Sequence, residues 1–103
     1  MKMKISPLTD NPLTLMRRAG YTFQRAEGGE QSFVRELARG NYPRFHVYVR
    51  VEKTTAFINL HLDHKGHTYG DATRHHGEYE YTGAVKEETD RLLTLWGERV
   101  SIV

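Results

Sequence analysis

Two stretches of alternating apolar and polar residues, separated by a Lys-Thr break, constrain the fold of this chain more than any other feature. They run from residue 44 to 52 and from 55 to 63, and alternation with period two is typical of half-buried β-strands. Pairing Glu52 with Thr55 places each apolar residue opposite another: Phe45–Leu62, Val47–Leu60, Val49–Ile58 and Val51–Ala56. A slip of one residue would turn one apolar set into water, so the pattern predicts this register.

The same register predicts the opposite, polar face of the hairpin. The residues expected there are Arg44, His46, Tyr48 and Arg50 on the first strand and Asp63, His61, Asn59 and Phe57 on the second. His46 and His61 become direct neighbours, and Asp63 lies two residues from His61 on the same face. We therefore expect any chemistry to be concentrated on this face and in the segment that follows it.

The remaining patterns predict an α+β fold in which an antiparallel sheet of four to six strands carries two helices on one face. In chain order we expect an edge strand at 1–5, a helix that begins at Pro12, has Arg17 and Arg18 in its last turn and is stopped by Gly20, a hairpin of 21–25 and 31–38, a helix at 84–96 and a strand at 100–103. Asn11 is the expected N-cap of the first helix. The length of 103 residues predicts a single domain, 1–103.

Several side-chain positions follow from these elements. In the first helix we expect Leu13 and Met16 to face inward, with Leu15 as a further candidate, and in the second we expect Arg91 to belong to the solvated face. The hairpin around the Gly28-Gly29 turn permits two registers. A three-residue loop would place Phe23 opposite Phe33, and a two-residue loop would place it opposite Val34. The alternation there does not choose between them.

Composition bounds the cellular setting. The chain contains no cysteine, which excludes disulfides and thiolate sites and predicts a reducing, cytoplasmic location. No apolar run approaches the roughly 20 residues of a membrane span, so no membrane contact is expected. The net charge of +2 permits nucleic-acid binding without requiring it.

The histidines gather beside the hairpin, and the candidate metal ligands are His61, Asp63, His64, His67, His75 and His76. Imidazoles and carboxylates bind zinc and similar divalent ions when no thiolate is present, so zinc is the candidate cofactor. The segment from 64 to 81 shows no period, and we expect it to be a long loop that packs against the polar sheet face. No ordered metal motif on a helix accompanies the cluster.

Two other functions compete for the polar face. His46, His61 and Asp63 are candidate catalytic residues, because paired histidines transfer protons near neutral pH and would suit a metal- or histidine-dependent hydrolase such as a ribonuclease. Arg44, Tyr48, Arg50 and Phe57 are candidate nucleic-acid-binding residues, because sheets use exposed aromatics and arginines to stack unpaired bases. We expect a binding module, with RNA or another protein as partner.

The N-terminal third resembles the HicA-type mRNA interferase toxins, in a helix ending at Ala19-Gly20-Tyr21 and a following strand with Arg25. The resemblance implies a double-stranded-RNA-binding-like α-β-β-β-α fold. The catalytic histidine of those toxins follows the glycine turn, where this chain has Gly28-Gly29-Glu30-Gln31 and no histidine. The segments at 61–63 and 77–79 resemble short bacterial proteins, and this second resemblance implies no activity.

Overall fold

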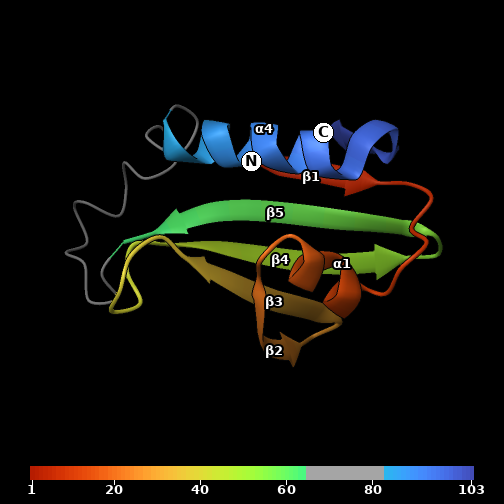
Figure 1. Cartoon of the computed structure of the whole chain (residues 1–103). Coiled ribbons are helices and arrows are strands. Elements are labelled where there is room, and N and C mark those ends of the chain that lie inside the picture. The colour runs from red at the N-terminus through yellow and green to blue at the C-terminus, as the bar shows by residue number, and fades with distance from the viewer. Residues whose placement is uncertain (65–82) are drawn as a thin grey trace.

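The computed structural model describes residues 1–64 and 83–103, which form an antiparallel sheet of six strands and two α-helices (Figure 1). The elements are β1 (Lys2–Ile5), α1 (Pro12–Arg18), β2 (Thr22–Glu27), β3 (Glu30–Glu36), β4 (Arg44–Glu52), β5 (Thr55–Asp63), α4 (Ala84–Trp96), the 3₁₀-helix η1 (Gly97–Arg99) and β6 (Val100–Ile102). The strand order is β2-β3-β4-β5-β1-β6. The predicted α+β class is confirmed.

The central hairpin of β4 and β5 has the predicted register along its whole length. Glu52 pairs with Thr55 at the turn, and Arg44 pairs with Asp63 at the far end. Its apolar side chains lie in the core beneath the helices, with Val47 and Leu60 fully buried. At the two ends of the hairpin burial is less complete: Leu62 is partly buried, and Val51, next to the turn, is 40% exposed.

The hairpin of β2 and β3 combines features of both predicted registers. A two-residue turn at Gly28–Gly29 joins the strands, and both glycines have positive φ, which glycine adopts without steric cost. This turn alone would pair Phe23 with Val34. A bulge at Gln24 shifts the register by one residue, and Phe23 therefore lies opposite Phe33. The two rings meet edge to face, with their centroids 5.7 Å apart.

The N-terminal strand β1 lies inside the sheet, and the prediction that it forms an edge is wrong. It pairs with β5 on one side and with β6 on the other. Met3 and Ile5 are buried in the core. Alternation consequently places Lys2 and Lys4 on the other sheet face.

Helix α1 begins and ends as the sequence predicts. Asn11 Oδ1 accepts a hydrogen bond from the Thr14 amide at 2.8 Å, which satisfies one of the free donors at the helix start. Met16 and Leu15 are buried, but Leu13 is 41% exposed, so its predicted inward orientation is wrong. The buried side of this short helix is centred between residues 15 and 16, about 110° around the axis from Leu13.

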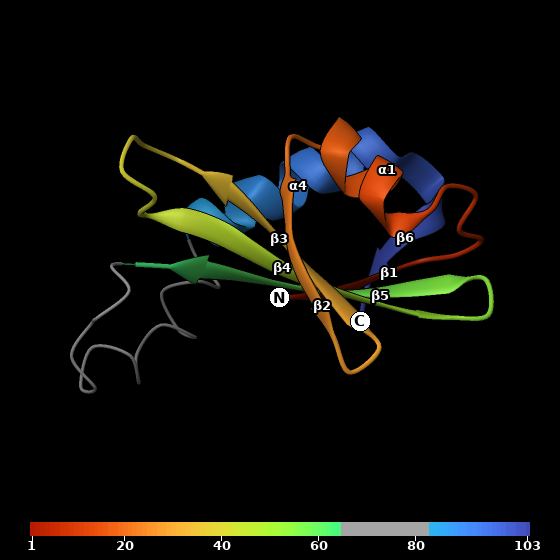
Figure 2. The ribbon, with the colours of Figure 1, turned by 90° about the horizontal axis from the view of Figure 1, so that it is seen from below.

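Helix α4 spans the predicted residues and lies with α1 on the same side of the sheet (Figure 2). Its predicted inner stripe is buried: Val85, Thr89, Leu92 and Trp96. Val85, Leu92 and Trp96 form one hydrophobic core cluster with the apolar side chains of the sheet beneath. No helix among the described residues is long and apolar enough to cross a membrane.

A buried charge cluster joins α4 to the chain after α1. The Glu88 carboxylate accepts hydrogen bonds from Tyr21 Oη at 2.6 Å and from Arg91 Nε and Nη2 at 2.7 and 2.8 Å, and Arg35 Nη1 lies 3.4 Å away. Arg91 Nη2 also donates to the Ala19 carbonyl at 2.7 Å. Burial, with the hydrogen bond to Glu88, raises the pKa of the Tyr21 phenol well above its usual range. The Arg91 side chain is 39% exposed, as expected for the solvated face, but its guanidinium reaches the buried Glu88 carboxylate, which the sequence did not indicate.

Candidate nucleic-acid interface

The sheet face opposite α1 and α4, called the polar face from here on, carries the candidate residues described above. Strand pairing places on it Lys2 and Lys4 of β1, Glu30 of β3, Arg44, His46, Tyr48 and Arg50 of β4, and Phe57, Asn59, His61 and Asp63 of β5. In Figure 2 the helices of the described chain lie on the opposite side of the sheet. The polar face is therefore the side on which the described elements leave room for a partner.

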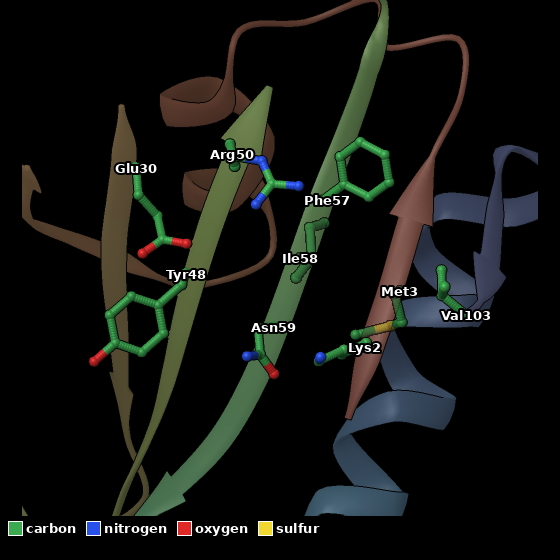
Figure 3. A pocket seen from close by; sticks show the side chains of 9 residues that line it. All are labelled: Lys2, Met3, Glu30, Tyr48, Arg50, Phe57, Ile58, Asn59 and Val103. Atoms are coloured by element: carbon green, nitrogen blue, oxygen red, sulfur yellow. The ribbon is translucent and has the colours of Figure 1, made fainter. Parts of the chain in front are cut away.

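A hollow of about 190 Å³, called the sheet hollow, lies on this face (Figure 3). Its lining residues are Lys2, Met3, Glu30, Tyr48, Arg50, Phe57, Ile58, Asn59 and Val103. Four adjacent strands, β3, β4, β5 and β1, contribute most of them. In Figure 3 the short Asn59 side chain lies between Tyr48 and Lys2, which explains the depression there.

The aromatic and cationic candidates meet at the sheet hollow. Arg50 and Phe57 are cross-strand partners, and the guanidinium lies 5.2 Å from the centre of the Phe57 ring. Such a contact is attractive because the ring face is electron-rich. Tyr48 packs against the His46 ring, and the two ring centroids are 4.4 Å apart. The structure thus places three of the four predicted nucleic-acid-binding residues at one site.

The fourth candidate, Arg44, lies elsewhere. It is six residues from Arg50 along β4, about 20 Å at the usual rise of a strand. Its guanidinium lies over the Tyr42 ring at 4.6 Å, and its Nε is 3.8 Å from Asp63 Oδ2, too long for a hydrogen bond. Lys2 and Glu30 were not predicted as site residues, since their approach depends on strand order, and Asn59 was predicted on this face but not as a site residue.

His46 and Asp63 form a close pair at the same end as Arg44. Asp63 Oδ2 lies 2.9 Å from His46 Nδ1, and a carboxylate can only accept, so Nδ1 carries the proton. The hydrogen bond from His46 holds the pKa of the Asp63 carboxyl below its ordinary value, and the charges of His46 and Arg44 act in the same direction. His61 lies directly opposite His46, as predicted.

The pair has part of the geometry of a general acid–base site. A carboxylate that orients one imidazole nitrogen leaves the other free to exchange a proton with a substrate. His46 Nε2 is buried, however, and within residues 1–64 and 83–103 it has no hydrogen-bond partner. A substrate would have to reach an enclosed atom, so the geometry supports proton transfer less well than binding at the sheet hollow.

The predicted metal ligands divide into two groups. His61, Asp63 and His64 belong to the described chain, where no set of three or more metal-ligating side chains converges on one point. His67, His75 and His76 lie outside the described residues. The predicted docking of the segment from 64 to 81 on the polar face also falls outside them, apart from its first residue.

The substitution Asp63→Asn is expected to remove part of the acid sensitivity of the fold. Because the folded pKa of Asp63 is lowered, its carboxylate stabilises the fold above the ordinary aspartate value of about 3.9. This stabilisation is lost as the pH falls through the lowered pKa. In thermal melts the melting temperature of the wild type should exceed that of the variant at about pH 6, and the two melting temperatures should become equal at about pH 2. A difference in melting temperature that does not change with pH would contradict the hydrogen bond between His46 and Asp63.

Comparison with protein-family models, with curated proteins and with solved structures gave no match.

Proposed function

We propose that this chain binds single-stranded nucleic acid on the polar face of its sheet, with the sheet hollow at the centre of the interface. One observation carries the proposal: two aromatic side chains, Tyr48 and Phe57, and two cationic ones, Arg50 and Lys2, line the same shallow depression. Unpaired bases stack on exposed aromatic rings, and cations beside the rings attract the phosphates.

The arrangement of charge suggests how a single strand of nucleic acid would lie on the sheet. Lys2 and Lys4 are exposed and lie on β1, directly across from Asn59 and Phe57 of β5. Phosphates over β1 would therefore place the attached bases over β5 and β4, where the rings are. A double helix hides the faces of its bases, so this arrangement favours an unpaired strand.

Truncating the two rings is the test of this proposal. Tyr48→Ala and Phe57→Ala are each expected to weaken the binding of a labelled single-stranded oligonucleotide by about 1–3 kcal/mol, or about 5- to 150-fold in Kd. Fluorescence anisotropy at low salt measures the Kd. Phe23→Ala is the matched control, because Phe23 is an exposed ring on the other side of the sheet, opposite Phe33.

Unchanged affinity in both ring variants would overturn the stacking surface. Wild-type affinity should also fall steeply with salt, because bound phosphates release counterions. Cleavage of the oligonucleotide that His46→Ala abolishes would instead favour the hydrolase, and loss of cleavage on adding a chelator would favour its metal-dependent form. The His46–Asp63 hydrogen bond is the observation that keeps this second function in view.

A further inference from the structure

Glu30 is an unexpected residue beside a site for a polyanion. Among the described residues that line the sheet hollow, Lys2 and Arg50 carry positive side chains and Glu30 the negative one. A carboxylate next to a bound phosphate chain weakens binding by repulsion. A site built only for non-specific attraction would gain affinity from a neutral residue at this position.

The local structure does not neutralise the Glu30 carboxylate. Its cross-strand partner is Arg50, but Arg50 Nε donates instead to Glu52 Oε2 at 2.8 Å, and the guanidinium lies over Phe57. In the described part of the chain, no hydrogen bond or ion pair engages the Glu30 carboxylate. Figure 3 shows it pointing toward the Tyr48 ring.

The position of Glu30 relative to the rings suits an acceptor for the edge of a base. Asn59 on β5 lies directly opposite Tyr48, whereas Glu30 on β3 lies diagonally across from Tyr48, two residues along from its direct partner Ser32. Glu30 and Asn59 are therefore about 10 Å apart across the sheet and about 7 Å apart along it. A single planar base over Tyr48 would have its edges toward these two polar side chains. The volume of about 190 Å³ is far above the roughly 10–15 Å³ that holds one water molecule on the same measure, so a planar base can enter the hollow.

We infer that the sheet hollow takes a base with an exocyclic amino group, cytosine in preference to uracil, and that Glu30 accepts the hydrogen bond from that amino group. The inference rests on the proposed function. Carboxylates accept from the cytosine N4 amino group, which is a donor. Uracil carries a carbonyl oxygen at the same position, and two acceptors facing each other repel.

The test compares oligocytidine and oligouridine of about ten nucleotides, which match in ring size and charge. Wild type should bind oligocytidine about tenfold more tightly in anisotropy titrations at neutral pH, corresponding to about 1.4 kcal/mol. Glu30→Gln should bring this ratio near one and strengthen the binding of oligouridine. Glu27→Gln is the matched control, because Glu27 pairs with Glu30 across β2 and β3 but does not line the hollow.

The outcomes separate the inference from the proposed function. Glu27→Gln should strengthen the binding of both oligonucleotides alike and leave the ratio at its wild-type value. Equal binding of the two oligonucleotides by wild type, or a preference that survives Glu30→Gln, would overturn the role of Glu30 while leaving nucleic-acid binding intact. Absence of binding to either oligonucleotide would overturn the proposed function, and the inference with it.

Discussion

Leu60→Ala is expected to lower the free energy of unfolding by about 2–5 kcal/mol, because it removes a fully buried side chain and leaves a cavity in the centre of the sheet. Asn59→Ala, one residue away on the polar face, should change it by less than about 0.5 kcal/mol. Chemical denaturation of the purified variants measures both. Leu95→Ala is the matched control, since Leu95 is a leucine that is 49% exposed on α4.

The contrast between neighbouring positions tests the register itself. Under the observed pairing, Leu60 lies opposite Val47 in the core and Asn59 opposite Tyr48 on the polar face. A larger loss in Asn59→Ala than in Leu60→Ala would mean that the two faces of β5 are exchanged.

The substitution Arg91→Met should cost about 2–4 kcal/mol, because it keeps most of the aliphatic stem and leaves the Glu88 carboxylate, which is 2% exposed, without its closest cation. The figure is below the range of about 3–5 kcal/mol for a wholly buried pair, since the Arg91 side chain is 39% exposed and Arg35 remains nearby. The same denaturation experiment measures it.

Lys86→Met provides the comparison on the same helix. It breaks the exposed pair of Lys86 and Asp90 and should cost no more than about 0.5 kcal/mol. Equal effects of the two substitutions would show that the Glu88 cluster contributes no more than an ordinary surface ion pair.

Periodicity predicted the parts of the fold in which a shift would expose apolar side chains. The β4–β5 register was predictable because both strands alternate, so a slip of one residue is costly along their whole length. The bounds of α4 were predictable because its apolar residues repeat with the helical period and Gly97, with a φ of 70°, ends it.

Other features depend on partners that a local pattern does not name. Alternation in β1 separates Met3 and Ile5 from the lysines, but it does not reveal that β1 lies between β5 and β6. The burial of Glu88 on α4 depends on such partners too, namely Tyr21 and Arg91. Glu88 lies three residues after Val85 and four before Leu92, within the buried stripe, and that spacing was the available signal of a buried carboxylate.

The candidate site divides in the same way. Tyr48, Arg50 and Phe57 belong to one hairpin, so a single register was enough to bring them together. Lys2 and Glu30 come from strands on either side of that hairpin, and their approach requires the order of the whole sheet. Local sequence patterns therefore could not predict that Glu30, which we infer to accept a hydrogen bond from the base, lies at the site.

The most direct test of the central claim is to map the bound strand on the protein by NMR. Titration of ¹⁵N-labelled protein with single-stranded oligocytidine should shift the amide signals of Lys2, Tyr48, Phe57 and Asn59 on the polar face. The signals of Lys86 and Leu95, which are exposed on α4, should stay in place. Shifts confined to α4, or no shifts at an oligonucleotide concentration that saturates anisotropy, would contradict binding at the sheet hollow.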